Sequence, residues 1–131
     1  MDKIRIENGV VSAFGLIPGK STIGEVANLL GACAGVQSAS GVSLHSFLDG
    51  NFVAAVQDGD AVVSTFILLP DIADSKYVPQ TLEDAKVIFH DLKLANPEQS
   101  GLLLAECPGV KLACDMSFSA GKVLWLELHR F

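Results

Sequence analysis

A glycine-rich stretch that leads into a lysine is the first part of this sequence that suggests chemistry. Residues 15–22, Gly-Leu-Ile-Pro-Gly-Lys-Ser-Thr, follow an apolar segment and precede a helical pattern, which is the setting of a phosphate-binding loop. That loop needs four residues between its glycines, and here there are three, with Phe14 where the first glycine belongs. A nucleotide site is therefore disfavoured. A single anion at the helix N-terminus, held by Gly19, Lys20 and Ser21, stays open as an alternative.

Three histidines could act in catalysis or bind a metal. His45, His90 and His129 have no metal-ligand neighbour at i+2 or i+4, so their spacing does not predict a zinc site. We expect His90 to lie near a helix C-terminus, where a positive charge complements the helix dipole. His45 and His129 fall on predicted strands and could share one face of a sheet.

Three cysteines, Cys33, Cys107 and Cys114, form an odd set without CxxC spacing, which indicates reduced thiols. Cys114 falls on a buried alternation, where a thiol is inert. Cys107 borders a Pro-Gly turn, and a Cys–His pair formed in space stays open for it alone. No other catalytic arrangement is present, so we expect no enzyme activity, no metal and no cofactor.

Acidic residues gather at predicted turns rather than in a catalytic pair. Turn chemistry accounts for Asp49 and Asp58, and the alternative is an acidic rim, with Asp60, that contacts a basic protein. Trp125 is the strongest candidate for an interface anchor if it is exposed, with packing under an N-terminal hairpin as the equal alternative. The predicted partner-binding residues are Trp125, Glu127, Asp115, His45, Asp49, Asp58 and Asp60.

Composition narrows the class of protein further. The chain has 131 residues, 50% of them hydrophobic, which suits a single domain (1–131) with a substantial core. Its formal net charge of −6 argues against nucleic acid and anionic membranes as partners and permits a basic protein. The charged residues 1–7 do not resemble a signal peptide, and no apolar run is long enough to span a membrane. We therefore expect a cytoplasmic protein.

The first half reads as a hairpin, a helix and three strands. Residues 3–14 predict the hairpin around Asn8-Gly9. Thr22 and Glu25 predict a capping box for a helix over 23–30 that ends at Gly31. Residues 32–41 predict a loop. The strands are predicted at Val42–Leu48, Asn51–Gln57 and Asp60–Leu69, and a linker is predicted over 71–80.

The second half has the same order. Thr81 predicts the cap of a helix over Leu82–Lys93, and residues 94–100 break the helical pattern. The predicted strands are Gly101–Cys107, Val110–Phe118 and Lys122–His129. In the last strand Leu124, Leu126 and Leu128 alternate with Trp125, so we expect the leucines in the core and Trp125 on the opposite face.

The two halves also share a spacing. Thr22 and Thr81 are 59 residues apart, as are Gly50 and Gly109. This predicts an α+β fold of two tandem helix-plus-three-strand-meander repeats, 15–70 and 78–131, preceded by the hairpin 3–14. The meanders would join into one antiparallel sheet with both helices on one face.

One motif of the first repeat resembles known families. Thr22-x-x-x-Val26-x-x-x-x-Gly31, preceded by Gly19 and followed by a meander, is similar to the motif of the outer-membrane assembly lipoproteins of the SmpA/OmlA type. It also resembles the tandem-repeat β-lactamase-inhibitor-protein fold. The resemblance implies a two-repeat sheet whose concave face grips a protein partner. The chain lacks the lipid-anchoring N-terminal cysteine of those lipoproteins and a proline after Gly31.

These observations predict a small acidic binding protein, in particular a bacterial inhibitor or immunity protein that occludes the site of a toxin or enzyme. It would be a monomer or a homodimer. Two alternatives stay open. One is a chaperone or adaptor that binds an extended segment of a secreted effector. The other is an anion- or nucleotide-binding domain that uses the N-terminus of the first helix and Lys20.

Overall fold

The computed structural model describes residues 4–7, 9–69, 78–94, 101–116 and 121–130. Several sequence-based predictions fall beyond these ranges. They are most of the linker over 71–80, residues 95–100 of the predicted break, and the end of the predicted strand Val110–Phe118.

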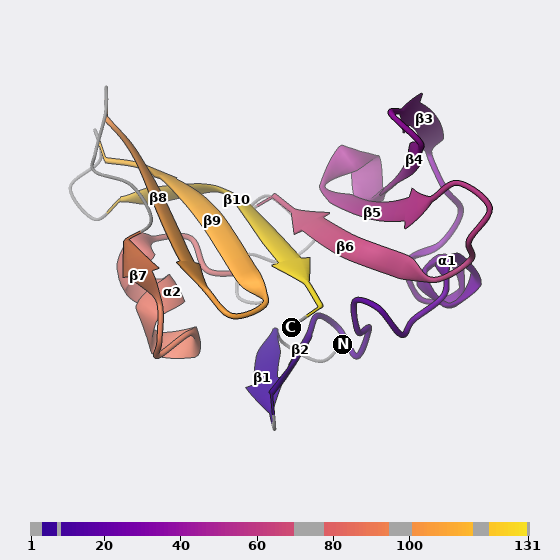
Figure 1. Cartoon of the computed structure of the whole chain (residues 1–131). Helices are drawn as coiled ribbons and strands as arrows, with labels where there is room; N and C mark the ends of the chain where they lie inside the picture. Colours follow the sequence, from indigo (N-terminus) through magenta and orange to yellow (C-terminus); the bar gives the residue numbers. More distant parts are fainter. Residues whose placement is uncertain (1–3, 8, 70–77, 95–100, 117–120, 131) are drawn as a thin grey trace.

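The chain has a mixed α+β fold built on an antiparallel sheet of eight strands, with a separate two-stranded sheet and two α-helices. The strand order is β3-β4-β5-β6-β10-β9-β8-β7, so the two halves of the chain meet where β6 pairs with β10. Figure 1 shows both helices and the β1–β2 hairpin on one side of the large sheet. The bounds are β1 Arg5–Glu7, β2 Val10–Ser12, α1 Ile23–Leu30, β3 Gly35–Ala39, β4 Val42–Phe47, the 3-10 helix η1 Leu48–Gly50, β5 Phe52–Gln57, β6 Val63–Leu68, α2 Leu82–Ile88, β7 Lys93–Leu94, β8 Leu102–Cys107, β9 Val110–Asp115 and β10 Lys122–His129.

Helix α1 begins and ends where the sequence predicted. The Thr22 hydroxyl accepts a hydrogen bond from the Glu25 N–H at 3.2 Å, and the Glu25 carboxylate accepts one from the Thr22 N–H at 3.3 Å. This reciprocal capping box satisfies two N–H groups that a helix N-terminus otherwise leaves unpaired. The Gly31 N–H closes the helix on the Ala27 carbonyl at 2.9 Å, with Gly31 at a positive φ of 96°.

Removal of the Thr22 cap gives a direct test of this helix start. Thr22→Ala is expected to lower the free energy of unfolding by about 1 kcal/mol, because the Glu25 N–H loses its acceptor. Thr22→Ser keeps the hydroxyl and should change the stability much less. Urea unfolding of both variants measures the difference, and equal stabilities would show that the cap contributes nothing.

The prediction of a loop over residues 32–41 was wrong in its second half. Gly35–Ala39 forms β3, which pairs with β4 through the tight turn Ser40-Gly41, where both residues have positive φ. The segment has only one β-branched residue and no clear alternation, so local sequence gives little strand signal. Pairing with β4 decides its conformation.

The second helix is shorter than predicted. It ends at Ile88 instead of Lys93, because Phe89 leaves the helical conformation (φ −110°, ψ 86°) and its side chain is fully buried. Lys93 and Leu94 then pair with β8 as the edge strand β7. Each helix is therefore followed by four strands, not three. The Thr81 hydroxyl caps the helix, as predicted, by accepting a hydrogen bond from the Asp84 N–H at 3.1 Å.

Both helices are tied to the sheet by backbone hydrogen bonds of the same kind. In each half, the N–H of the first helical residue donates to a carbonyl just before the last strand of that half. An N–H of the same strand donates to the carbonyl of the residue that precedes the helix N-cap. The N–H to O distances are 2.9 Å for Ile23 to Ala61 and 3.0 Å for Leu82 to Gly121, and 2.9 Å for both Val63 to Ser21 and Val123 to Gln80.

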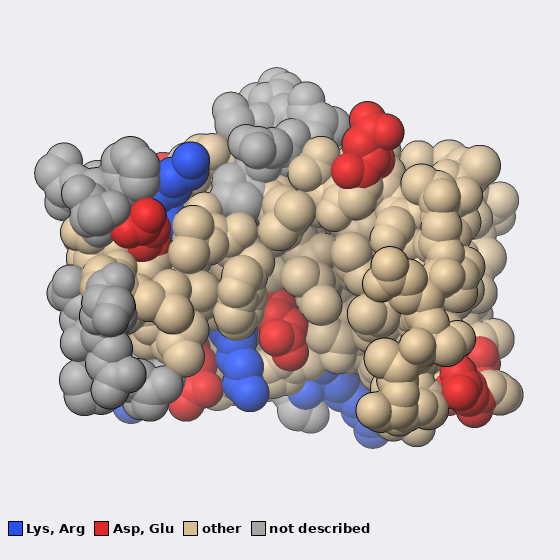
Figure 2. All heavy atoms as spheres, turned by 90° about the horizontal axis from the view of Figure 1, so that it is seen from above, with Lys and Arg blue, Asp and Glu red and all other residues tan. Residues whose placement is uncertain are grey.

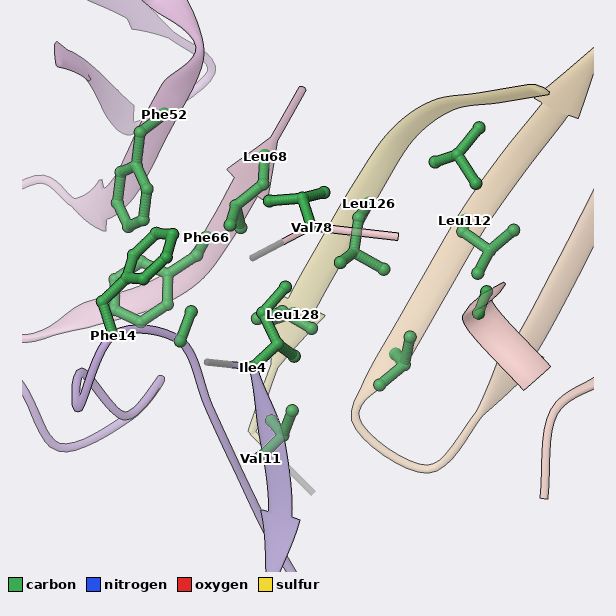
Figure 3. Packing of buried hydrophobic residues seen from close by; sticks show 14 of the residues in the cluster. Ile4, Val11, Phe14, Phe52, Phe66, Leu68, Val78, Leu112, Leu126 and Leu128 are labelled. Carbon is green, nitrogen blue, oxygen red and sulfur yellow. The ribbon is translucent and has the colours of Figure 1, made fainter. Parts of the chain in front are cut away.

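The core lies between the sheet and the layer formed by the helices and the hairpin. Figure 3 shows Phe14, Phe52 and Phe66 turned toward one another, with the ring centroids of Phe52 and Phe66 5.3 Å apart. Leu126 and Leu128 of β10 continue this cluster toward the hairpin, whose Val11 is 2% exposed. The hairpin is thus part of the core layer on the helix side.

Leu124 does not join the core as predicted. The register between β10 and β9 shifts between Val123 and Trp125, which is a β-bulge. The extra residue breaks the simple alternation, so Val123 is fully buried and Leu124 is 38% exposed. Leu126 and Leu128 are buried as expected, and Trp125 lies on the other face.

Candidate protein-binding surface

The large sheet has one face against the core and one open face. In the part of the chain that the structure describes, no helix or strand covers the open face (Figure 1). Figure 2 views the molecule from that side and shows broad areas without charged side chains, with acidic and basic groups next to each other in places. The open face is defined by the strand residues whose side chains alternate with the core residues.

A band of apolar side chains crosses the open face from β4 to β8. Its members lie on strands that pair side by side, and most are half-buried by their neighbours. Ala55 and Ala113 at its floor are only 8% and 1% exposed although they belong to this face. The apolar band consists of Leu44, Val53, Ala55, Ile67, Trp125, Ala113 and Leu104.

Trp125 lies near the middle of the apolar band, on the strand that joins the two halves of the sheet. It is opposite Ala113 on β9, and Ala113 is opposite Leu104 on β8. The Trp125 side chain is half-buried, so it is neither in the core under the hairpin nor fully exposed. A large aromatic side chain held by its neighbours in a shallow apolar setting has the character of an interface anchor.

Charged residues cross the same face in one row. Glu127 is opposite Lys111, Lys111 is opposite Glu106, and Glu106 is opposite Lys93 on the β7 edge. The signs alternate, so the row places both acidic and basic groups beside the apolar band. Asp115 lies on the same face, opposite Lys122. The structure therefore brings together three of the predicted partner-binding residues, Trp125, Glu127 and Asp115.

His45 does not share this face. It pairs with Ala54, a core residue, so its side chain belongs to the face that carries the helices. His129 pairs with Thr65 and belongs to the open face, so the prediction that the two histidines could share a face was wrong. The Nε2 atom of His129 is buried and has no hydrogen-bond partner among the described residues, and its Nδ1 lies 3.4 Å from the Arg130 carbonyl oxygen.

The predicted acidic rim is divided between two ends of the sheet. Asp49 lies in η1 before β5, whereas Asp58 and Asp60 follow β5. The six residues of β5 separate the two groups by a distance on the order of 20 Å. Asp58 accepts a hydrogen bond from the Ser43 hydroxyl at 2.9 Å, and Asp60 accepts two from the next two backbone N–H groups. The Asp60 carboxylate therefore stabilises its own turn, and the Asp58 carboxylate links the same turn to β4.

The alternative of an anion at the N-terminus of α1 is not supported by the geometry. The N–H groups of Gly19, Lys20 and Ser21 donate to carbonyl groups of the protein, at 2.7, 3.1 and 2.8 Å. The Ser21 hydroxyl accepts a hydrogen bond from the Ile17 N–H at 2.9 Å. The Glu25 carboxylate already occupies the helix N-terminus and repels a second negative charge.

A hollow of about 640 Å³ lies elsewhere, at the end of β7 and β8. Asp91, Cys107 and Pro108 line both this hollow and a second one of about 330 Å³, which His90 also lines. The sequence had left a Cys–His pair open for Cys107. Burial, and then the Asp91 carboxylate, raise the pKa of the Cys107 thiol. A nucleophilic cysteine needs the opposite shift, so the hollow does not activate this thiol.

The described ranges contain neither a cluster of metal-binding side chains nor a membrane-spanning helix. Within the described ranges, no three His, Cys, Asp or Glu side chains gather closely enough to hold a metal ion. The helices found there are also too short or too polar to cross a membrane. All three cysteines are free: Cys33 is exposed, Cys107 is half-buried and Cys114 is buried.

Comparison with known proteins yields a likeness of fold. No family model matches the chain, and no curated protein matches it. Among solved structures, the chain is similar to a DUF4309 family protein (YjgB) from Bacillus subtilis subsp. subtilis str. 168, with a TM-score of 0.54 and 14% sequence identity. The match covers 94% of this chain and 88% of that one. At this identity the likeness concerns the fold alone, and the resemblance to inhibitor proteins or assembly lipoproteins stays a prediction.

Proposed function

We propose that this protein binds another protein through the open face of its large sheet, as an inhibitor or immunity protein that occludes the site of a toxin or enzyme. The observation that supports this most directly is the apolar band with Trp125 near its middle. Interfaces bury a central apolar cluster inside a polar rim, and the open face has this composition. The row from Glu127 to Lys93 and the pair Asp115–Lys122 provide the polar surroundings.

The partner in this proposal is a basic protein. The net charge of −6 favours encounter with a positively charged surface, and Glu127 lies directly next to the apolar band, on β10. The turn residues Asp49, Asp58 and Asp60 are exposed at opposite ends of β5, so they would contribute to long-range attraction more than to one contact. We place the protein in the cytoplasm, where three free thiols are stable.

We further propose that the two halves are tandem repeats of one unit, each a helix followed by four strands. The equivalent hydrogen bonds that tie α1 and α2 to the sheet support this, as do the 59-residue spacings of Thr22 and Thr81 and of Gly50 and Gly109. A duplicated unit would explain why the sheet is continuous and why its open face is broad. Such surfaces suit macromolecular partners better than small ligands.

Truncation of Trp125 tests the proposed function. The partner is captured from the native lysate with tagged protein, identified and purified, and its affinity is then measured by calorimetry. Trp125→Ala should weaken binding about 30-fold, which corresponds to roughly 2 kcal/mol for an interface anchor. The proposal also requires that the unmodified protein inhibits the activity of the purified partner.

A matched control uses the helix side of the molecule. Val87 on α2 is 71% exposed and lies away from the open face, so Val87→Ala should leave the affinity unchanged. Circular dichroism establishes that both variants are folded. If Trp125→Ala binds as tightly as the control, the open face is not the interface and the proposed function falls.

A further inference from the structure

The two edges of the large sheet differ in length and in charge. At one edge, β7 has two residues, and Lys93 and the nearby Asp91 place charges there. At the other edge, β3 has five residues, all of them exposed, and Val36 is 55% exposed. Proteins commonly protect sheet edges by making them short or charged, because an open edge pairs with other strands. The β7 edge follows this rule and the β3 edge does not.

The segment that holds β3 has no charged residue of its own, and the Asp58 carboxylate lies on the far side of β4, at Ser43. No Asp, Glu, Lys or Arg occurs from residue 26 to residue 48, a range that includes the end of α1, β3 and β4. Leu29 near the end of α1 is 43% exposed, which adds apolar surface to this end of the molecule. Figure 1 shows β3 at the outer margin of the sheet, opposite the β7 end.

The hairpin geometry identifies the backbone groups of β3 that point outward. Ala39 and Val42 flank the two-residue turn and face each other, and the Ser46 carbonyl accepts a hydrogen bond from the Ala34 N–H on the same side. Because N–H and C=O directions alternate along an antiparallel strand, Val36 and Ser38 direct their backbone groups away from β4. No strand in the described part of the chain pairs with them.

We infer that β3 pairs antiparallel with β3 of a second copy of this chain, around a two-fold axis at Gln37. In this register Val36 exchanges both backbone hydrogen bonds with the partner's Ser38, and Ser38 does the same with the partner's Val36. The outward backbone N–H and C=O groups of Val36 and Ser38 then all form hydrogen bonds with the second copy. A shift of the axis by one residue would require either Ala34, whose N–H is engaged, or Ser40, which lies in the turn.

Charge favours a second copy as the occupant of this edge. Each copy has a net charge of −6, so two copies repel each other over most approaches. The repulsion is weaker where formal charges are sparse, and the segment from residue 26 to residue 48 contributes none to this edge on either copy. A two-fold axis perpendicular to the sheet also leaves the open faces of both copies on the same side.

The interface is narrow, so we expect a reversible dimer with a micromolar dissociation constant. Sedimentation velocity from low micromolar to millimolar protein measures it directly. Val36→Lys with Ser38→Lys places like charges opposite each other twice and should weaken the dimer at least tenfold. Leu94→Lys on β7 adds a lysine at a side chain that is 63% exposed on the other edge, and should leave dimerisation unchanged.

A charge-paired variant tests the register itself. Val36→Lys with Ser38→Glu places opposite charges face to face in the proposed register and should dimerise about as well as the unmodified chain. If the unmodified chain is monomeric throughout the range, or if the double-lysine variant dimerises normally, β3 is not the interface. If the charge-paired variant is monomeric while the unmodified chain dimerises, the axis at Gln37 is wrong. Pairing at the β3 edge is independent of the proposed partner of the open face.

Discussion

Phe52→Ala is expected to lower the free energy of unfolding by about 3–5 kcal/mol, which is the range for removing a buried aromatic ring. Phe52 is fully buried. The centroid of its ring lies 6.1 Å from the ring centroid of Phe14, 6.4 Å from that of Phe47 and 5.3 Å from that of Phe66. These rings connect the segment after the hairpin, β4 and β6 to β5. Loss of the ring therefore removes contacts to several elements at once and leaves a cavity that they cannot fill.

Urea unfolding of two further variants makes this result interpretable. Phe52→Leu keeps most of the apolar volume and should cost about 1–1.5 kcal/mol. Val87→Ala at an exposed helix position should stay within about 0.5 kcal/mol of the unmodified protein. Because domains of this size are stable by only about 5–15 kcal/mol, Phe52→Ala should also lower Tm clearly. A loss of less than about 1 kcal/mol would show that this aromatic cluster is not packed as described.

The three cysteines are expected to react with a thiol reagent at very different rates. Cys33 is exposed and should be labelled first, whereas Cys114 is 0% exposed and reacts only when the protein opens. An opening free energy of about 5 kcal/mol already slows a reaction more than 1,000-fold, so Cys114 should be slower than Cys33 by at least about that factor. Variants that retain one cysteine each allow the rates to be measured separately.

The pH dependence of labelling tests the setting of Cys107. Burial and the Asp91 carboxylate raise the pKa of its thiol, so less of the reactive thiolate is present at neutral pH than for an ordinary cysteine. Its labelling rate should continue to rise as the pH passes the ordinary thiol pKa of about 8.5. Asp91→Asn removes one of the two causes and should increase the rate of Cys107 at pH 8.

The same shift has a consequence for stability. Burial also raises the pKa of the Cys114 thiol. The unfolded chain releases these protons at a lower pH than the folded protein does. The raised pKa values therefore contribute to the stability of the folded state, and this contribution is fully present below the ordinary thiol pKa of about 8.5. That contribution is lost as the pH rises through the folded-state pKa values. If Cys107 is labelled at neutral pH as fast as Cys33, its setting is not the one described.

Short-range patterns in this sequence predicted several features correctly. Thr22, Glu25 and Gly31 determine both ends of α1, because caps are contacts between residues three or four positions apart. The strands β4, β5 and β6 and the N-terminal hairpin follow from alternation and turn residues in the same way. The alternation of β10 also placed Leu126 and Leu128 in the core and Trp125 on the opposite face.

Contacts between residues distant in the sequence decided the rest. Gly35–Ala39 is a strand because β4 pairs with it, and α2 ends early because Phe89 is buried and β7 pairs with β8. The bulge beside Trp125 exposes Leu124, although a simple alternation predicts its burial. Likewise, the sequence identified Trp125 and Glu127 as candidate binding residues, but only strand pairing shows that Ala113 and Lys111 lie opposite them. Strand pairing also shows that His45 lies on the other face of the sheet. Side-chain types and local geometry are encoded along the chain, whereas neighbours across a sheet depend on register, which only the folded structure fixes.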